Sequence, residues 1–384
     1  MAHVDNLRRQ FPAVRHGVYL NTGTFGLLPT DTVQAMQDSL ASQLENGRRA
    51  DTYLADLNEA RAVVRTQLAQ WFSVPTETIA LTESTTHGLN VVLNGLRFQA
   101  RDEVIVLDVE HPGSLLPLFL QKQRQGVVIR VVSGSQSREE LLRAIERAFS
   151  PRTRLLVVSH VSYLTGHNNP IAALTQLAHQ HHVQILVDGA QGAGTEPTSL
   201  AELQCDFYAF PGHKWLCGPD GTGALYVKNE WLSVLEPTYA GYPMLLQEDS
   251  FNFSGTFLSP LCASRYEHAT TNLASWRGLS TSLQYLKVTV GADYMYTRLH
   301  GLTGYLIDKL LDLNEAKIIT PRDARAGLAH FTWGSRDAGE VVTLLRDRDI
   351  YVKAVRQNNT IRVSPHFYNQ EGDVDRFLRA LMEV

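Results

Sequence analysis

Two short stretches of the chain decide its fold. Residues 187–191 read Val-Asp-Gly-Ala-Gln, and residues 212–221 read Gly-His-Lys-Trp-Leu-Cys-Gly-Pro-Asp-Gly. Each stretch lies at the end of an apolar run with the composition of a buried strand, so Asp188 and Lys214 come where strands end. In an open α/β sheet, ligands bind outside the carboxyl ends of the strands. We therefore expect an acid and a lysine together at a ligand site.

Seven apolar runs alternate with helical patterns between about residues 30 and 230. The runs are 78–81, 104–107, 127–132, 155–158, 185–187, 207–210 and 224–227. They are rich in Val and Ile, which indicates strands buried on both faces. This pattern predicts an α/β fold with a mostly parallel, seven-stranded sheet and helices on both faces. The first two helices are expected from residue 30 to near Gly47 and over 54–68.

After about residue 270 the pattern changes. We expect a long helical region over about 272–313, strands at 350–352 and 360–363, and a terminal helix at 373–384. This indicates a smaller α+β C-terminal domain. We predict three divisions: residues 1–16, an N-terminal segment packed on the small domain; residues 17–262, the large domain; and residues 263–384, an interdomain helix with the small domain.

The composition excludes several classes of protein. The chain has 39 acidic and 35 basic residues, and no long run carries one sign, so neither a nucleic-acid nor a membrane partner is expected. No stretch is apolar enough to span a bilayer, and residues 1–9 lack the core of a signal peptide. The three cysteines form no CxxC, which favours a cytoplasmic setting. His179 and His182 could share a helix face, but the helix dipole also favours histidines there, so no metal site is predicted.

The pair of acid and lysine is what pyridoxal 5′-phosphate (PLP) requires. A lysine holds the cofactor aldehyde as an imine, and a carboxylate keeps the pyridine nitrogen protonated so that the ring accepts electrons. Residues 81–90 read Leu-Thr-Glu-Ser-Thr-Thr-His-Gly-Leu-Asn and enter a helix, where hydroxyls and free N–H groups suit a phosphate. Alone, each motif is more often a cap, a turn or a solvated side chain. Together they indicate PLP.

The pattern Gly-His-Lys-x-x-x-Gly-Pro-x-Gly, with Val-Asp-Gly-Ala-Gln upstream, resembles the class V aminotransferase-like family of fold-type I PLP enzymes. That family includes cysteine desulfurases, cystine C–S lyases, isopenicillin N epimerases and some aminotransferases. The similarity runs from about Tyr19 to the C-terminus. It implies PLP fold-type I, PLP as cofactor, and a homodimer with active sites shared across the interface.

The resemblance also implies roles for matching residues in the cofactor site. Lys214 binds the cofactor and moves protons, while Asp188 pairs with the pyridinium and Gln191 with the phenolic oxygen. His111, in Asp-Val-Glu-His-Pro at 108–112, stacks on the ring and can act as an acid or base. The residues expected at the phosphate are Thr85, Thr86, His213 and, for the neighbouring subunit's phosphate, Thr270.

For the substrate, the resemblance places Arg362 on the carboxylate, a task that suits a bidentate guanidinium, and Asn21 beside it. The cystine C–S lyases have a second arginine nine residues earlier. Here that position is Lys353, which keeps the charge without the fork geometry, and Arg356 is a candidate substitute.

The chain departs from the desulfurases at three places. Residues 353–360 read Lys-Ala-Val-Arg-Gln-Asn-Asn-Thr, without the nucleophilic cysteine that desulfurases carry there. Pro211 replaces a serine two residues before the His-Lys pair. Tyr163 replaces an asparagine near the phenolic oxygen, which puts that contact in doubt.

We therefore expect a PLP-dependent C–S β-lyase that acts on cysteine, cystine or a cysteine S-conjugate and gives pyruvate, ammonia and a thiol or persulfide. Aminotransferase and epimerase chemistry remain alternatives, because both share the carbanion with the lyase and residues 364–369 also resemble the epimerase-like branch. A scaffold or sulfur-relay partner without turnover is an alternative of another class.

Overall fold

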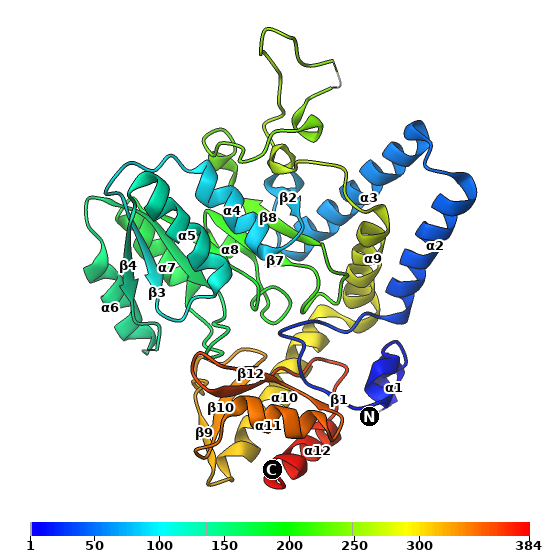
Figure 1. The fold of residues 1–384 in the computed structure, drawn as a ribbon, viewed down its shortest axis with the longest axis vertical. Coiled ribbons are helices and arrows are strands. Elements are labelled where there is room, and N and C mark those ends of the chain that lie inside the picture. Colours follow the sequence, from blue (N-terminus) through cyan, green and yellow to red (C-terminus); the bar gives the residue numbers. More distant parts are fainter. Residues whose placement is uncertain (1, 136, 248) are drawn as a thin grey trace.

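The computed structural model describes residues 2–135, 137–247 and 249–384, and it consists of a large body above a smaller one (Figure 1). Met1, Gln136 and Glu248, which fall within the predicted divisions, lie outside the described residues. None of the helices in the described ranges is both long and apolar enough to cross a membrane.

The large body is built on a seven-stranded sheet in the order β2-β8-β7-β6-β5-β3-β4. Strand β8 runs antiparallel to β2 and β7, and the other neighbours are parallel. The predicted mostly parallel sheet is confirmed. The bounds are β2 Ile79–Thr82, β3 Glu103–Leu107, β4 Val128–Val132, β5 Thr153–Ser159, β6 Gln184–Asp188, β7 Phe207–Pro211 and β8 Gly223–Val227.

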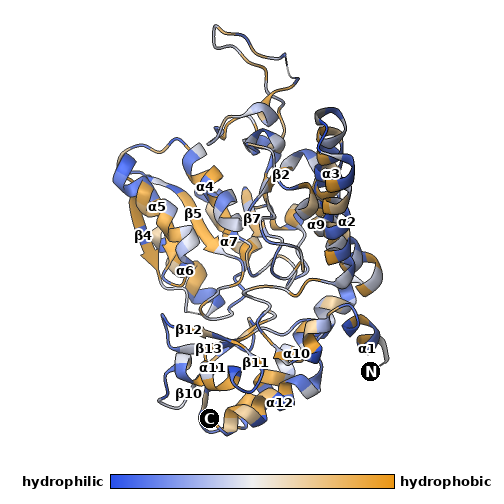
Figure 2. Ribbon diagram, turned by 45° about the vertical axis from the view of Figure 1, so that its right-hand side comes forward, coloured by the Kyte–Doolittle hydropathy of each residue, from blue (hydrophilic) through white to orange (hydrophobic). Residues whose placement is uncertain are grey.

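Helices cover both faces of this sheet, which explains why its strands read as continuous apolar runs. Along β3, Ile105 and Leu107 pack into one core cluster, while Val104 and Val106 pack into another. Figure 2 shows hydrophobic residues along β4 and β5 and hydrophilic residues on the outer helices. The helices are α2 Thr30–Asn46, α3 Ala50–Trp71, α4 Thr85–Gly95, α5 Pro112–Gln125, α6 Arg138–Ala148, α7 Ile171–Gln180 and α8 Leu200–Leu203.

The smaller body has its own antiparallel sheet, in the order β12-β13-β10-β9, and its own core cluster. Its elements are β9 Ala316–Ile318, β10 Ala329–Trp333, α11 Ala338–Arg346, β11 Ile350–Tyr351, β12 Lys353–Val355, β13 Thr360–Val363 and α12 Glu371–Met382. The strand expected at 350–352 corresponds to β11, and β12, which begins at Lys353, was not predicted. Strand β11 pairs with β1 (Val18–Tyr19), and β12 pairs with β13.

The helical region expected over 272–313 is divided. Helix α9 (Leu273–Gln284) passes into a π-helix, Tyr285–Val290, and Gly291 then adopts a positive φ of 81° before α10 (Ala292–Leu311). Glycine adopts this backbone conformation without a steric penalty, so it allows the break. Short 3₁₀ turns lie at Pro12–Arg15, Thr76–Thr78, Asn229–Trp231, Tyr242–Met244 and Ala263–Tyr266.

The N-terminal segment, with α1 at Ala2–Arg8, packs against residues from near the C-terminus. The Phe11 ring lies 4.6 Å from that of Tyr368 and 5.6 Å from that of Phe367, measured between centroids. Arg8 Nη1 lies 2.7 Å from Asp373 Oδ2. The boundaries at 16/17 and 262/263 stay a proposal.

Candidate active site

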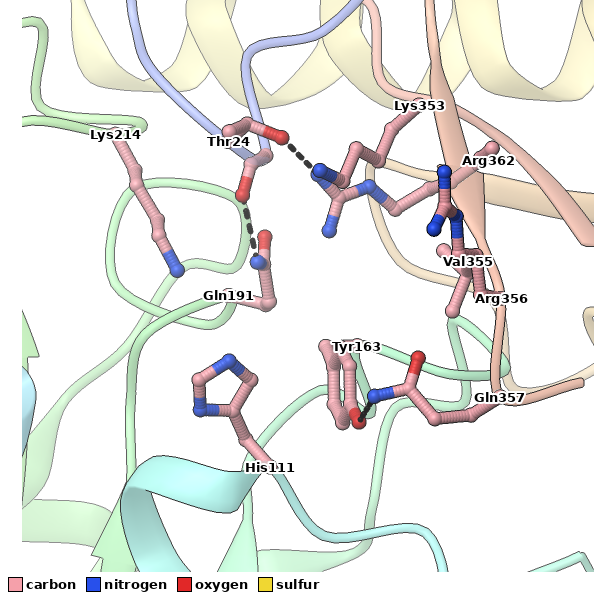
Figure 3. A pocket seen from close by; sticks show the side chains of 12 residues that line it. Thr24, His111, Tyr163, Gln191, Lys214, Lys353, Val355, Arg356, Gln357 and Arg362 are labelled. Atoms are coloured by element: carbon pink, nitrogen blue, oxygen red, sulfur yellow. Dashed lines mark hydrogen bonds between the residues drawn. The ribbon is translucent and has the colours of Figure 1, made fainter. Parts of the chain in front are cut away.

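A cavity of about 780 Å³ lies where the carboxyl edge of the large sheet meets the hairpin β12–β13 (Figure 3). Four parallel strands supply its floor, because His111 follows β3, Tyr163 follows β5, Gln191 follows β6 and Lys214 follows β7. The lining residues are Gly23, Thr24, His111, Tyr163, Gln191, Lys214, Lys353, Ala354, Val355, Arg356, Gln357 and Arg362. Six of the predicted site residues are thus brought together from distant parts of the sequence.

Lys214 places its amine in this cavity. Its removal from water lowers its pKa to about 8; the negative charge of Asp188 opposes this shift and the Arg362 guanidinium adds to it. A larger fraction of the amine is therefore neutral near pH 7 than in an ordinary lysine, and the neutral form is the nucleophile and base. Its main chain is packed closely: a Cβ on Gly26 would lie 1.9 Å from the Lys214 carbonyl oxygen.

Asp188 is the last residue of β6 and is buried. Its Oδ1 accepts a hydrogen bond from the Ala190 N–H (2.9 Å), and its Oδ2 accepts one from the Ser114 hydroxyl (2.7 Å).

Nearby, burial raises the pKa of Glu110 to about 8, against hydrogen bonds from Ser159 that lower it. At neutral pH Glu110 is therefore mostly protonated.

Gln191 is held from two sides. Its Nε2 donates to the Gly23 carbonyl (2.8 Å), and its Oε1 accepts from the Trp215 indole N–H (2.9 Å). An amide nitrogen carries two hydrogens, so one is left for a ligand oxygen. The supporting roles of Trp215 and Ser114 were not predicted, because nothing in their spacing shows which strand they face.

His111 caps the start of α5 and accepts a hydrogen bond at Nδ1 from the Gly113 N–H (2.9 Å). The neutral ring therefore carries its proton on Nε2. Burial lowers its pKa, as do Lys214 and Arg362, while Asp188 opposes the shift. The ring packs edge-on against Tyr163, with 4.7 Å between centroids.

Thr85, Thr86 and His213 are not among the residues that line the cavity, although His213 adjoins Lys214 in the chain. Thr85 and Thr86 open α4, and Ser84 caps that helix by accepting from the His87 N–H. Thr86 lies beside the start of α5, since a Cβ on Gly113 would come 2.7 Å from its hydroxyl. The helix start and its hydroxyls suit a phosphate.

Thr270 is not brought to this cavity. Its hydroxyl is hydrogen-bonded to the Tyr242 hydroxyl (2.6 Å) in an exposed region. Tyr242 instead lines a separate hollow with residues of α3.

Arg362 is a buried cation, with 4% of its surface exposed. Its Nη2 donates to the Thr24 hydroxyl and, at 3.4 Å, to Asn21 Oδ1, while its Nε has no partner. Among the described residues no carboxylate forms an ion pair with it. Burial lowers its pKa to about 10, so it stays charged at neutral pH. A buried cation without a counter-charge favours an anionic ligand. Thr24, three residues after Asn21, was missed because hydroxyls are common in such turns.

Residues 353–360 correspond to the stretch in which desulfurases carry their nucleophilic cysteine. Here two amide side chains of this stretch form hydrogen bonds to the large body. Gln357 Nε2 donates to the Tyr163 hydroxyl (3.1 Å), and Asn358 Nδ2 donates to the Leu164 carbonyl (2.7 Å). None of the three cysteines lines the cavity; Cys205 and Cys217 are fully buried, which raises their thiol pKa values.

These residues fit PLP. A lysine with a lowered pKa and a fixed, buried carboxylate follow neighbouring strands, and a helix start with hydroxyls lies beside them. His179, considered above as a metal ligand, is instead paired with Asp206 at 3.0 Å.

Comparisons with known proteins agree with this geometry. Residues 18–377 match the aminotransferase class-V family. A probable cysteine desulfurase of Xylella fastidiosa is 29% identical over 405 residues, covering 99% of this chain and 95% of the relative. The complex of the cystine C–S lyase C-DES with its product cysteine persulfide is 29% identical, with a TM-score of 0.91 and coverage of 97% and 99% of the two chains. A C-DES mutant with glycine covalently linked to its PLP cofactor is 28% identical, with a TM-score of 0.92 and coverage of 97% and 98%. The chain belongs to the aminotransferase class-V family.

Proposed function

We propose that the protein is a PLP-dependent carbon–sulfur lyase that acts on cysteine, cystine or a cysteine S-conjugate. The products are pyruvate, ammonia and a thiol or persulfide. One observation carries this proposal: a single cavity, lined by no cysteine, holds the Lys214 amine and the Arg362 guanidinium, whose Nε has no hydrogen-bond partner among the described residues.

PLP, when bound, supplies an electron-accepting ring that stabilises negative charge at the substrate Cα. Lys214 would bind it, Asp188 would face its pyridine nitrogen, and Gln191 would face its phenolic oxygen. Thr85, Thr86 and His213 would hold its phosphate. The hydrogen bonds from Ser114 and Ala190 fix the Asp188 carboxylate for this task.

Arg362 binds the substrate carboxylate and, through it, fixes the direction of the Cα–H bond. This orientation selects proton removal over cleavage of the other bonds at Cα. The neutral Lys214 amine takes the proton. His111, with its proton on Nε2, donates to the departing sulfur. The sum is R–S–CH₂–CH(NH₃⁺)–COO⁻ + H₂O → R–SH + pyruvate + NH₄⁺.

The absent cysteine favours the lyase over a persulfide-forming desulfurase, even though the Xylella relative is named a probable desulfurase. A desulfurase reaction transfers sulfur to an enzyme thiolate. Cys205 and Cys217 are buried and their pKa values are raised, so neither can serve as that nucleophile. In this chain, the sulfur leaves with the substituent that it already carries.

Pyruvate release from the PLP-loaded protein tests the proposal. The panel comprises L-cysteine, L-cystine, an S-alkyl cysteine and its sulfoxide, with L-serine as the oxygen control. Pyruvate from a sulfur substrate, lost in Lys214→Ala, is the expected result. No pyruvate from any sulfur substrate, with PLP visibly attached, would overturn the proposal and favour amino-group transfer or epimerisation.

We also propose a cytoplasmic homodimer with shared active sites. Thr270 is exposed and lies outside the cavity of its own subunit, and its hydroxyl, which can make more than the one hydrogen bond to Tyr242, would contact the phosphate of a neighbour. The three cysteines are free, as a reducing compartment would keep them. Light scattering should give twice the chain mass of 42.9 kDa. Mixing Lys214→Ala with Thr270→Ala subunits should restore activity, since one site of each mixed dimer is intact.

A further inference from the structure

Tyr163 lines the cavity, and the proposed reaction gives its hydroxyl no role. It lies in the turn after β5, at the position where desulfurases carry an asparagine. A phenol O–H is far more acidic than an amide N–H, so it donates a stronger hydrogen bond. The replacement therefore places an acidic O–H group at the cavity.

The Tyr163 hydroxyl is held by Gln357 but keeps its own hydrogen. Gln357 Nε2 donates to the phenolic oxygen (3.1 Å), which leaves the O–H hydrogen as a donor. Within the described parts of the chain, no acceptor takes that hydrogen. Burial raises the pKa of the phenol, Glu110 adds to this shift and Arg362 opposes it, so the hydroxyl stays protonated at neutral pH. The cavity thus contains a fixed donor that is open to a ligand.

The place of Tyr163 in the cavity corresponds to that of the substrate sulfur. In the proposed function, three groups on the substrate Cα already have partners: the amine is held at the cofactor, the carboxylate contacts Arg362, and the hydrogen faces Lys214. In Figure 3, Lys214 and Arg362 lie in the upper part of the cavity, whereas Tyr163 and His111 lie in the lower part. The fourth group, CH₂–S, is left to point toward Tyr163 and His111.

Tyr163 and His111 present two donors to that region. Their rings pack edge-on with 4.7 Å between centroids, so each side chain supports the other. Nδ1 of His111 accepts from the Gly113 N–H (2.9 Å), which leaves its Nε2–H as a donor. Donors that are fixed where charge develops stabilise a transition state strongly, because they need not reorient. A sulfur that leaves as a thiolate would meet both of them.

We propose that Tyr163 is a further catalytic residue, whose O–H donates to the substrate sulfur while the Cβ–S bond breaks. This inference rests on the proposed lyase function. Lys214 takes the Cα proton, the electron pair of the Cα–H bond forms the second Cα–Cβ bond, and the pair of the Cβ–S bond leaves with the sulfur. His111 then gives the sulfur its proton, while Tyr163 retains its own. Gln357 is a positioning residue, since it holds the phenolic oxygen.

Two substrates with leaving groups of different basicity test this role. S-propyl-L-cysteine releases a strongly basic alkyl thiolate, whereas S-phenyl-L-cysteine releases a weakly basic aryl thiolate that needs little help. Tyr163→Phe removes only the hydroxyl. We expect kcat/KM to fall about 100-fold for S-propyl-L-cysteine and less than about tenfold for S-phenyl-L-cysteine. The ratio of the two values in one preparation cancels any loss of folded or PLP-loaded enzyme.

Two further variants frame this result. Gln357→Leu should change the ratio in the same direction but less, because the hydroxyl remains and is no longer held. Tyr305→Phe is the matched control. The Tyr305 hydroxyl donates to Asp375 (2.7 Å) outside the cavity, so its loss should leave the ratio unchanged.

Exchange of the Cα hydrogen with deuterium from the solvent separates proton removal from sulfur departure. Tyr163→Phe keeps Lys214, so it should still exchange this hydrogen in S-propyl-L-cysteine while it forms less pyruvate. NMR of the recovered substrate and of the pyruvate gives the ratio of exchange to elimination. We expect this ratio to rise at least about tenfold over that of the natural protein.

A second readout needs no turnover. Lys214→Ala protein with added PLP cannot remove the Cα proton, so it holds the amino acid intact. With 3-fluorotyrosine in place of Tyr163, ¹⁹F NMR reports what lies next to the hydroxyl. The resonance should differ between S-propyl-L-cysteine and L-2-aminoheptanoate, in which CH₂ replaces the sulfur. The absorbance of PLP shows that both amino acids are bound.

An unchanged substrate ratio in Tyr163→Phe, exchange and elimination that fall together, or the same ¹⁹F resonance with both amino acids would overturn this role. Pyruvate from S-propyl-L-cysteine with the natural protein would still support the lyase in each case. Pyruvate from no sulfur substrate would instead overturn the proposed function, and the role of Tyr163 with it.

Discussion

The side chains of the cavity are held by partners that are far away in the sequence. Ser114 supports Asp188, Trp215 supports Gln191, and Asn21 and Thr24 support Arg362. These hydrogen bonds fix each side chain before a ligand binds, so less conformational freedom is lost on binding. The reactive groups therefore depend on residues that do not react.

At the residue scale, the rate of covalent PLP attachment should depend on the pKa of Lys214, which is about 8. Only the neutral amine attacks the cofactor aldehyde. The rate should rise with pH toward about 8 and level off above it, whereas an ordinary lysine would still gain near pH 10. Stopped-flow absorbance of apoenzyme mixed with PLP gives this profile. Lys214→Ala should show no covalent attachment, and a rate that keeps rising to pH 10 would contradict the shift.

Arg362→Gln should lower kcat/KM for every amino-acid substrate by roughly 100-fold, because the substrate carboxylate loses a charged hydrogen-bond partner. Arg362→Lys should recover part of the loss but not all, since an ammonium cannot form the bidentate contact. The absorbance of attached PLP in each variant separates substrate binding from cofactor binding. A loss of bound PLP in proportion to the activity would assign Arg362 to the cofactor instead.

The sequence pointed to the proposed reactive residues more readily than to the residues that support them. Asp188 and Lys214 could be recognised because each follows an apolar run and because PLP requires an acid and a lysine together. Ser114 and Thr24 were missed because a hydroxyl in a helix or turn is common, and only the folded chain shows what it faces. Tyr163 occupied a position where contact was in doubt, yet its ring lines the cavity and packs on His111.

At the scale of elements, Glu267 connects three of them. It accepts hydrogen bonds from Arg61 and Arg65 of α3 and from the Leu81 N–H of β2, and it follows the turn Ala263–Tyr266. Glu267 and Arg61 are both buried.

Glu267→Gln should therefore destabilise the protein by about 3 kcal/mol, because it leaves a buried arginine without its counter-charge. Urea unfolding measures the loss. Glu236→Gln is the matched control, since its ion pair with Arg97 is exposed and should contribute much less to stability. Similar losses in the two variants would contradict the role of Glu267.

Glu103 joins the starts of neighbouring strands at the other end of the sheet. Its carboxylate accepts from Arg130 of β4, and from Ser150 and Arg152 before β5. The Arg130 hydrogen bond in particular lowers its pKa to about 2, against the effect of burial.

A lowered carboxylate pKa stabilises the fold above the unfolded pKa of about 4.5, and this contribution is lost as pH falls toward 2. The difference in stability between the natural protein and Glu103→Gln should thus be constant above about pH 5 and shrink below it. Urea unfolding at several pH values checks this, and a difference independent of pH would contradict it.

The predicted bounds of the elements agree with the structure where a strand is apolar along its whole length. They differ from it where the chain changes its pairing partner or its helix type. All seven strands of the large sheet were predicted, because burial on both faces gives continuous apolar runs in six of them. The expected burial is wrong for β4, an edge strand that is apolar in sequence but largely exposed, with Val131 63% exposed. The change of partner between β11 and β12 was not predicted, since residues 350–355 carry no turn signal. Strand β11 pairs with the distant β1, whereas β12 forms a hairpin with β13. The π-helix before Gly291 likewise depends on packing that residue periodicity does not encode.

At the scale of the whole molecule, the cofactor and the substrate carboxylate would contact different bodies. The proposed PLP residues belong to the large sheet and its loops, whereas Arg362 belongs to the small sheet. PLP alone should therefore slow hydrogen exchange in residues 84–95 and 211–218. Adding glycine should then slow it in residues 353–359. Glycinamide, which lacks the carboxylate, should not, and equal protection by both would contradict the assignment of Arg362.

The early and late parts of the chain meet at this cavity: Asn21 bridges to Ser364, and Arg362 contacts Thr24. This has a consequence for biosynthesis. The large sheet can assemble on the ribosome once residue 227 has emerged, since domains fold as units from the N-terminus. Arg362, which we propose to bind the substrate carboxylate, is in place only after β13, which is among the last strands to be translated. A prematurely terminated chain could thus carry Lys214 in place and still bind no amino acid productively, so catalytic competence is acquired only when synthesis is almost complete.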